Sequence, residues 1–519
     1  MSLHNIHYDL AIVGGGITGA GVAYDAICRG LNVVLLEQHD FGVGASTATS
    51  KLAHGGLRYL EQREFKLVKE SLNERNYLLN SAPHLVKPLQ FYVPIYKNTR
   101  WKKWQMSIGL KIYDLLQTDK QLPSNQMIKV KRLKNNVPWL KTTDIIGCGS
   151  YYDAQMDDHR LLIETLLMAE NEGAIIKNYS KVVDIKETAS GVSFDVESKF
   201  KKQHEYTASN MIVATGAWNN RVLNKSLVSP SKGIHIVLPD MDLSVALLLL
   251  TPQDDRVFFV IPWEGNTLVG TTETKDDGRY LSPKVTEAEV KYLLDAINYY
   301  STKKQWGLND VKSVFCGYRP LISTDNKPLS KKTREETYTW INDSVLSVSG
   351  GKYTTFKKMA KRAVQKLIDE KLSNRSLVKP NIDTNYIGAI NTSEWPSESQ
   401  LNQLHNRYGV QRESIIHLID KYGMLYKDIL NTISHQPEYS VRFDIGFPMI
   451  LAELKYTITK EWVKTPADFL LRRTYYAYLF RNQPDLLRSM IQQFYYMTNY
   501  KDFDIESDLL AIQNRVGWE

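Results

Sequence analysis

The stretch SKLAHGGLRYLE, residues 50–61, places cationic side chains on both sides of two adjacent glycines. Lys51 and His54 precede the glycine pair, and Arg58 follows it. Because glycine loses more backbone freedom on ordering than any other residue, such a pair favours a place where something comes close to bare backbone. Cations beside bare backbone suit an anion. On these residues alone, a solvated loop whose Arg58 pairs with a glutamate of the following helix is the simpler interpretation, because exposed charge pairs are common.

A second pattern with anion-binding chemistry lies near the start of the chain. The turn GGGITG joins an apolar strand at Leu10–Val13 to a helical pattern at Ile17–Arg29. Gly14 permits a tight turn, Gly16 lets the backbone approach a pyrophosphate, and Gly19 lets the helix pack close to the strand. The helix N-terminus then directs unpaired N–H groups at the phosphates. The pattern predicts a dinucleotide site.

Later residues extend this site. Glu37 ends a second apolar strand, 23 residues after Gly14, where a carboxylate can accept a hydrogen bond from a ribose hydroxyl. A late strand ends in the small-residue turn Ala214-Thr215-Gly216, and at Leu346–Ile368 a second glycine turn opens a second helix. An extended FAD crossing the sheet would use a second such turn, although an independent structural turn is the alternative.

Composition sets wider limits. A chain of 519 residues predicts two or three domains, and 43% hydrophobic with 24% charged residues is typical of a globular protein. The net charge of +8 is weak evidence for any acidic partner. Three scattered cysteines, Cys28, Cys148 and Cys316, indicate a reducing compartment. We expect no signal peptide, no membrane-spanning segment, no metal cluster and no Walker-type nucleotide loop.

Several motifs, in this order, resemble the FAD-dependent glycerol-3-phosphate dehydrogenases: GGGITGAG, SKLAHGGLRYLE, VATGAW, FVIPW with VGTTE, GYRPL and SVSGGKYTTF. Many flavoproteins share the first motif, whereas HGGLRYLE together with GYRPL and GGKYTTF is much more specific. The resemblance covers essentially the whole chain, including ELKYTITKEWVKTPADFLLRRT near its end. The wider group comprises the glycine- and D-amino-acid-oxidase-like flavoproteins.

The resemblance implies oxidation of sn-glycerol 3-phosphate to dihydroxyacetone phosphate in glycerol catabolism, with electrons passing to FAD and then to a membrane quinone. It implies a homodimer in the cytoplasm, bound peripherally to the inner face of the cell membrane. The fold it implies is an α/β FAD-binding Rossmann-like domain with an interleaved antiparallel-sheet substrate domain and an all-α C-terminal cap. We place the interleaved domains at 1–375, with the substrate part at roughly 85–150 and 225–330, a linker at 376–390 and the helical domain at 391–519.

Helical patterns support the C-terminal cap. They cover Leu401–Tyr408, Arg412–Tyr422, Pro448–Thr459 and Pro466–Tyr478. Within the last of these, Asp468 and Arg472 are spaced for an i,i+4 pair, and Arg472-Arg473 is a candidate bridge to another domain.

The implied reaction needs cations for a phosphate dianion and a base for the C2 hydroxyl proton. An arginine fork binds two phosphate oxygens at once, with lysine as a point charge. Matching the motifs residue by residue, the resemblance places Arg319 and Lys352 beside the flavin as catalytic groups, and gives substrate binding to Arg58, Tyr59, Arg319, Arg334 and Lys352. Lys352 could instead stabilise anionic reduced flavin.

The base stays open between His54 and His235, since both fall in family-like motifs and histidine titrates in the useful range. His235 lies in the apolar strand pattern Ile234–Leu238, where a hydrogen-bonded core histidine is the plainer interpretation.

The cofactor assignments also follow the resemblance. SKLAHGGLRYLE would run under the isoalloxazine, with its glycines letting the backbone pass near the ring while Arg58 faces the substrate. The residues assigned to FAD are Gly14, Gly16, Thr18, Gly19, Glu37, Ser46, Thr47, Ser50, Lys51, Leu52, His54, Gly55, Gly56, Val183, Ala214, Thr215, Gly216, Trp218, Arg319, Gly351, Lys352, Tyr353 and Thr354.

The segment Phe91–Leu116 interleaves tryptophans and apolar residues with lysines. An anionic membrane surface and an ordinary core helix with a basic face explain this pattern equally well.

Rival functions remain. A glycerol-3-phosphate oxidase would use the same site with oxygen as acceptor, although we see no obvious inserted segment of the kind these oxidases often carry. An amine or amino-acid oxidase fits less well, because the predicted cations suit a phosphate better than a zwitterion. A flavin- or RNA-binding protein without turnover lacks a recognisable RNA-binding module, so no nucleic-acid partner is expected.

Overall fold

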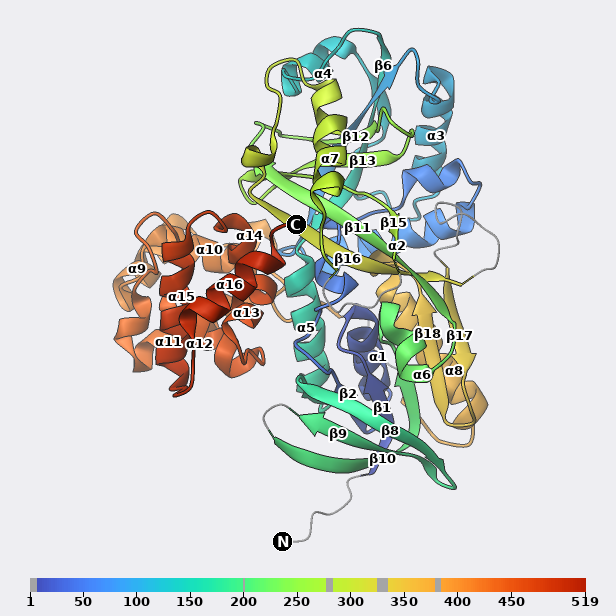
Figure 1. Cartoon of the computed structure of the whole chain (residues 1–519), viewed down its shortest axis with the longest axis vertical. Coiled ribbons are helices and arrows are strands. Elements are labelled where there is room, and N and C mark those ends of the chain that lie inside the picture. Colours follow the sequence, from blue (N-terminus) through green and yellow to red (C-terminus); the bar gives the residue numbers. More distant parts are fainter. Residues whose placement is uncertain (1–6, 199–200, 277–282, 324–334, 379–383) are drawn as a thin grey trace.

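The computed structural model describes residues 7–198, 201–276, 283–323, 335–378 and 384–519. The chain folds into two sheets stacked end to end, with a group of helices from its last part beside them (Figure 1).

The first sheet carries the predicted dinucleotide motif. Its parallel strands run in the order β18-β10-β1-β2-β7. Their bounds are β1 His7–Val13, β2 Val33–Leu36, β7 Ile175–Lys177, β10 Lys201–Val213 and β18 Val345–Gly350. The antiparallel strands β17 (Glu336–Trp340), β8 (Ser180–Thr188) and β9 (Gly191–Ser198) complete it. Strand β2 is buried at every residue, as expected of a parallel strand covered on both faces.

Helices cover one face of this sheet. Helix α1 (Ile17–Cys28) packs against both α8 (Phe356–Lys371) and α5 (Asp158–Asn171), and together they bury a core with β1 and β2. The short α6 (Asn219–Leu223) follows β10. The predicted Rossmann-like unit, with its strand, helix and second strand in register, is confirmed.

The second sheet has the order β15-β11-β14-β13-β12-β4-β6-β3, with β16 beside β11 and β5 beside β6. Its strands are β3 Leu52–Ala53, β4 Val86–Tyr96, β5 Gln126–Ile128, β6 Ile145–Met156, β11 Val228–Pro239, β12 Ala246–Leu250, β13 Val257–Trp263, β14 Asn266–Gly270, β15 Thr274–Lys275 and β16 Ser313–Ile322. Among the described residues, the strand pairings of this sheet are antiparallel except that of β4 with β12. The chain enters and leaves this sheet several times, so the two sheets are interleaved.

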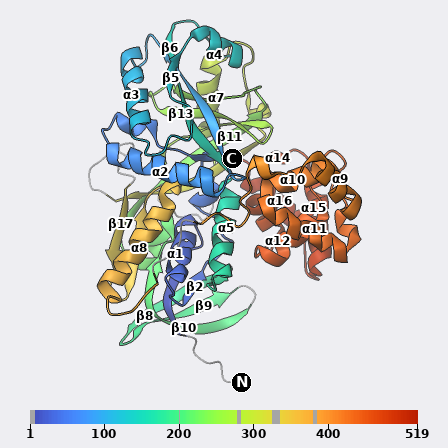
Figure 2. The ribbon, with the colours of Figure 1, turned by 180° about the vertical axis from the view of Figure 1, so that it is seen from behind.

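Further helices flank the second sheet. They are α2 Phe65–Ser81, α3 Lys103–Leu115, α4 Val130–Asn136 and α7 Glu287–Tyr300. Seen from behind, α2, α3 and α8 lie on one side of the molecule and the C-terminal helices on the other (Figure 2). The segment Phe91–Leu116 is therefore not one amphipathic element, because its first part is the interior strand β4 and only α3 is helical.

The C-terminal part is all helical, as predicted. Its helices are α9 Glu398–Tyr408, α10 Arg412–Tyr422, α11 Tyr426–His435, α12 Leu451–Lys460, α13 Pro466–Asp468, α14 Tyr476–Leu479, α15 Pro484–Thr498 and α16 Ile505–Arg515. It shares a hydrophobic core with the second sheet, where the ring of Phe315 stacks on that of Tyr478 at 3.8 Å between centroids. The predicted linker includes residues outside the described ones, but Tyr386 within it is buried and its N–H donates to the Ser81 carbonyl at 2.8 Å.

The predicted helix Pro466–Tyr478 is helical over most of its length but is interrupted at Thr474-Tyr475. A π-helical turn, Phe469–Arg473, separates α13 from α14, and the Thr474 N–H donates to the Phe469 carbonyl at 3.0 Å. The turn lets Arg472 and Arg473 both point at Asp40 of the first sheet's unit, so the predicted bridge is confirmed. The predicted Asp468–Arg472 pair is also present, at 2.7 Å.

Of the helices in the described part of the chain, none combines the length and apolar character that crossing a bilayer requires.

Candidate functional site

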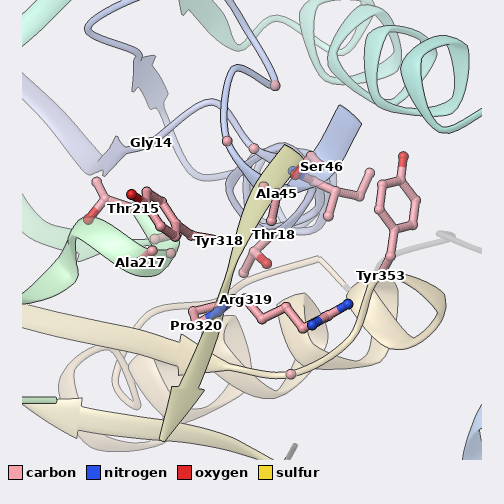
Figure 3. Close-up of a pocket in the computed structure, with 18 of the residues that line it drawn as sticks. Gly14, Thr18, Ala45, Ser46, Thr215, Ala217, Tyr318, Arg319, Pro320 and Tyr353 are labelled. Atoms are coloured by element: carbon pink, nitrogen blue, oxygen red, sulfur yellow. The ribbon is translucent and has the colours of Figure 1, made fainter. Parts of the chain in front are cut away.

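A long cavity lies between the carboxyl ends of the parallel strands and the second sheet, and holds about 1950 Å³ that no protein atom occupies, part of it open to solvent. Turns after β1, β2, β10 and β18 line it from one side, and β11 and β16 from the other. The carboxyl edge of a parallel sheet is where α/β folds bind their ligands. Figure 3 shows Gly14, Thr18 and Ser46 near the start of α1, with Arg319 reaching from β16 toward the side where Tyr353 lies.

The first glycine turn is built as the motif predicts. Gly14 has φ +114°, and a Cβ there would lie 2.6 Å from the Ala214 carbonyl oxygen. A Cβ on Gly19 would lie 1.9 Å from the Gly14 carbonyl oxygen, so helix and strand touch through it. At the start of α1 the Ile17 N–H donates to the Ser46 hydroxyl at 3.0 Å. A phosphate in this place would meet the helix N-terminus and a hydroxyl.

Glu37 fixes the turn from the end of β2. Its carboxylate accepts from the N–H of Gly15 at 2.7 Å and from that of His39 at 2.9 Å. Burial raises the pKa of Glu37, although these two hydrogen bonds oppose the shift. The side chain lines the cavity, so it can also face a ribose.

The second glycine turn follows β18. Gly350 and Gly351 both have positive φ, of +81° and +86°, a region that suits glycine. The turn places Lys352 with its Nζ 3.8 Å from the centroid of the Tyr59 ring. Next to it the Tyr353 hydroxyl donates to the backbone carbonyl of Asp158 at 2.7 Å.

His235 and Arg319 come from the neighbouring strands β11 and β16. The His235 Nε2 lies 2.8 Å from the Ser50 hydroxyl. Burial, with Arg319 and Lys51 nearby, lowers the pKa of His235 to about 3, so the imidazole is neutral near pH 7. The Arg319 guanidinium donates to the Thr271 hydroxyl at 2.7 Å and to the Thr272 carbonyl at 3.1 Å.

Arg58 lies beside the cavity, in a smaller apolar pocket that shares Leu52 and His54 with it. Its guanidinium is 5.0 Å from the Tyr59 ring centroid and donates to the Tyr59 hydroxyl at 3.4 Å. Tyr59 thus contacts two cations, Arg58 and Lys352.

Most predicted site residues come together here. Those lining the cavity are Gly14, Gly16, Thr18, Glu37, Ser46, Ser50, Leu52, His54, Tyr59, Ala214, Thr215, Gly216, Trp218, His235, Arg319, Gly351, Lys352, Tyr353 and Thr354. Those that do not line it are Gly19, Thr47, Lys51, Gly55, Gly56, Arg58 and Val183. Arg334 lies outside the described residues.

Two of these residues have partners elsewhere. Lys51 is fully buried and pairs with Asp158 at 2.7 Å. The Thr47 hydroxyl donates to the Gly42 carbonyl at 2.7 Å. On β8 the cavity is lined by Ser180, Lys181 and Val182, and not by Val183.

Sequence reasoning missed Thr271 and Thr272, which hold Arg319, and Asp158, which holds Lys51. The two threonines stand within the quoted motif VGTTE, where hydroxyls could have been matched to a predicted arginine. Asp158 carried no signal, because its partner is distant in the sequence.

A dinucleotide flavin fits this donor set. The two glycine turns leave bare backbone at the sheet edge, Ser46 and the start of α1 can meet a pyrophosphate, and Glu37 can meet a ribose. Arg319 and Lys352 leave the far side cationic, next to a neutral imidazole.

Two family models match the chain. That of the FAD dependent oxidoreductases covers residues 9–354, and that of the C-terminal domain of alpha-glycerophosphate oxidase covers residues 383–502.

Curated relatives match over nearly the whole chain. A glycerol-3-phosphate dehydrogenase of Synechocystis sp. is 32% identical over 91% of this chain and 89% of its own length. An aerobic glycerol-3-phosphate dehydrogenase of Staphylococcus aureus is 32% identical over 98% of this chain and 92% of its own.

Solved structures agree. A glycerol-3-phosphate dehydrogenase of Bacillus halodurans complexed with FAD aligns with a TM-score of 0.75 at 25% identity, covering 98% of this chain and 95% of its own. The L-alpha-glycerophosphate oxidase of Mycoplasma pneumoniae with FAD bound aligns with a TM-score of 0.58 at 16% identity, over 76% of this chain and 100% of its own, and shows shared fold.

Proposed function

Starting from the fact that this chain belongs to the family of FAD-dependent glycerol-3-phosphate dehydrogenases and oxidases, we propose that it oxidises sn-glycerol 3-phosphate to dihydroxyacetone phosphate and passes the electrons to a membrane quinone. Its cofactor is FAD.

The observation that supports this substrate most is that one cavity is lined by both cationic side chains and a group that can accept a proton. Arg319 and Lys352 line it as cations, while His235 lines it as a neutral imidazole. A phosphate dianion needs the first kind of group, and a hydroxyl that must lose its proton needs the second.

The chain's residues divide the work accordingly. Arg319, held by Thr271 and Thr272, binds phosphate oxygens with its fork. Lys352 and Tyr59 line the substrate side of the cavity, with Arg58 behind Tyr59. When bound, FAD supplies the acceptor for the hydride that leaves C2.

His235 takes the C2 hydroxyl proton as the C2–O bond becomes a carbonyl. The low pKa leaves the imidazole unprotonated before substrate binds, and its Nε2 contacts Ser50, a residue of the cavity lining. Once the substrate's phosphate is bound, its negative charge offsets Arg319 and favours the imidazolium. His54, at the same cavity, is the alternative base.

The experiment is an anaerobic absorbance spectrum of the purified protein before and after addition of sn-glycerol 3-phosphate, with glycerol as control. Bleaching of the flavin band by the phosphorylated compound alone supports the proposal. A flavin band that glycerol 3-phosphate leaves unchanged overturns the substrate and directs attention to amines and amino acids.

Oxygen is the second candidate acceptor. The match of residues 383–502 to a domain described from alpha-glycerophosphate oxidase favours it specifically. Admitting air to the reduced protein separates the two: reoxidation within the turnover time indicates an oxidase, and slow reoxidation that a soluble quinone accelerates indicates a dehydrogenase.

Helix α3 supports peripheral binding at the inner face of the cell membrane. Trp104 is 61% exposed, Ile108 50% and Leu115 79%, with Lys103 and Lys111 exposed on the same helix. Such a surface suits an anionic lipid interface. Flotation with anionic vesicles at low salt tests it against a Trp104→Ser/Ile108→Ser variant; equal flotation of both removes α3 from the proposal. We further propose a homodimer, which analytical ultracentrifugation tests.

A further inference from the structure

A cluster of buried polar side chains lies directly behind the cavity, where α5 begins. Asp158, the first residue of α5, is fully buried, as is Lys51. The Lys51 Nζ donates to the Asp158 carboxylate at 2.7 Å and to the Thr47 carbonyl at 3.0 Å. Removing a charge of each sign from water is costly, so such a pair needs a reason beyond stability.

Asp158 binds the segment 47–51 at two residues, Thr49 and Lys51. Its second carboxylate oxygen accepts from the Thr49 hydroxyl at 2.6 Å, and that hydroxyl in turn accepts from the Lys51 N–H at 2.9 Å. His159 adds a contact at the other end, with Nε2 3.0 Å from the Thr47 carbonyl oxygen. Lys51 has φ +57°, uncommon for a residue with a side chain, so these contacts hold a constrained loop.

The residue between Thr49 and Lys51 is Ser50, which reaches His235. The Ser50 hydroxyl lies 2.8 Å from His235 Nε2, and no other hydrogen-bond partner of that ring is found among the described residues. The position of Ser50 therefore depends on two neighbours that both bind Asp158.

The C-terminal helices reach the same carboxylate. Tyr475, between the π-helical turn and α14, donates to Asp157 at 2.7 Å and approaches Asp158 at 3.2 Å. Its ring lies 4.8 Å from the Lys51 Nζ, and the Phe315 ring 4.6 Å from it. One buried carboxylate thus joins the cavity loop, α5 and the C-terminal part.

We propose that Asp158 is a positioning residue, through which the buried Lys51 and Tyr475 of the C-terminal helices hold Ser50 against His235. Asp158 touches neither substrate nor flavin in this scheme. The expected effect of Asp158 on the rate of flavin reduction rests on the proposed function, whereas its expected effect on the position of Ser50 at His235 does not.

The test uses the full chain loaded with FAD and compares Asp158→Asn, Lys51→Met, the double variant Lys51→Met/Asp158→Asn and Tyr475→Phe. The readouts are the melting temperature, the ¹⁵N resonances of the His235 imidazole without substrate, and the rate of anaerobic flavin reduction. His235→Gln assigns the resonances. Asp25→Asn is the matched control, because Asp25 pairs with Arg29 at 2.6 Å, is also buried and does not line the cavity.

Asp158→Asn leaves Lys51 as an uncompensated buried cation and lowers the melting temperature; the double variant removes that charge and regains most of the loss. If Asp158 positions Ser50, the His235 resonances remain shifted in the double variant and flavin reduction remains slower by about tenfold to a hundredfold. In the control Asp25→Asn the melting temperature falls, but the His235 resonances and the rate of flavin reduction stay unchanged. Tyr475→Phe shifts the same resonances in the same direction by less.

A double variant that regains rate and resonances together with stability overturns the proposal, because Asp158 would then act only in folding. If the His235 resonances of Tyr475→Phe equal those of the wild type, the C-terminal helices do not help to position Ser50, and that step of the proposal is overturned. If glycerol 3-phosphate does not reduce the flavin even in the wild type, the proposed function fails. The His235 resonances then still decide the role of Asp158.

Discussion

At the scale of single residues, Gly233 on β11, two residues from the strand partner of Arg319, leaves room for the Arg319 guanidinium. A Cβ on Gly233 would lie 2.6 Å from the Arg319 guanidinium. Both terminal nitrogens of the guanidinium donate to threonines, which hold the side chain at the cavity wall. Charge and direction are therefore both fixed before a ligand arrives, which lowers the cost of binding a dianion.

Replacing this guanidinium should remove phosphate recognition. We expect Arg319→Ala to raise the KM for glycerol 3-phosphate on the order of 100-fold, since a charge-assisted bidentate contact is worth about two tenfold steps. Any activity on unphosphorylated glycerol should change little. Steady-state kinetics on both substrates measure this, with Arg132→Ala on the exposed face of α4 as control. Unaltered kinetics would remove Arg319 from the site.

Two buried histidines should make stability depend on pH. Burial, chiefly, lowers the pKa of His235 to about 3 and that of His159 to about 4, below the usual value of 6.5. Between pH 6.5 and 4 the unfolded chain therefore binds more protons than the folded one, and the free energy of unfolding falls as pH falls. At pH 5 each histidine should account for about 2 kcal/mol of this loss.

Denaturant unfolding of the wild type and of His159→Gln at pH 7 and pH 5 measures this. The variant should lose less stability between the two pH values, because it lacks one of the protons taken up on unfolding. An identical loss in both proteins would contradict the lowered pKa of His159.

At the scale of elements, the first glycine turn and α1 work as one unit, because Gly19 lets them touch. In Gly19→Ala the added Cβ would lie 1.9 Å from the backbone carbonyl oxygen of Gly14, so that carbonyl would have to move. The turn would open and flavin content of the purified protein should fall at least about tenfold, since close helix–strand packing aligns the pyrophosphate site. Gly109→Ala in α3, where nothing lies within 4 Å of the added Cβ, should keep its flavin. Full flavin content in Gly19→Ala would show that the contact is dispensable.

The sequence predicted elements well where local pattern and tertiary packing agree. Helix α10 has the predicted bounds, and β1, α1 and β2 lie around the glycine motif as predicted. It failed where distant partners decide. Arg473 meets Asp40, more than four hundred residues away in the chain, and the π-helical turn accompanies that contact. The prediction for Phe91–Leu116 joined the end of β4 to α3, because apolar and aromatic residues continue from the strand into the helix.

The same distinction holds for the site. Gly14, Gly16 and Gly351 line the cavity as expected, because their position depends on the turns that they themselves form, whereas Gly55 and Gly56 do not line it. Lys51 was assigned to the cofactor from its position in a motif, but a carboxylate 107 residues later binds its amine away from the cavity. Only the fold brings those two charges together.

At the scale of the whole molecule, buried ion pairs join the C-terminal helices to the unit that carries the dinucleotide turn. Arg473 binds Asp40 through two contacts of 2.9 Å, and Arg472 adds one of 2.5 Å. Arg160 on α5 binds both oxygens of Glu461 at 2.7 Å. The two arginines lower the pKa of Asp40 to about 2 against the effect of burial, so the carboxylate stays charged at any ordinary pH.

Breaking this junction should destabilise both parts, because Asp40 stands three residues after Glu37 and just before the cavity-lining segment 42–46. Asp40→Asn leaves two buried arginines without their charge partner and should lower the free energy of unfolding by about 3–5 kcal/mol. Hydrogen exchange should rise in residues 451–479, and flavin should dissociate faster. Glu506→Gln is the control, since its partner Arg488 lies at the surface and exposed pairs contribute at most about 1 kcal/mol. If Asp40→Asn matches that control in stability and in hydrogen exchange over 451–479, the C-terminal helices dock through the shared apolar core alone. The flavin site then does not depend on the ion pairs that join those helices to the first sheet's unit.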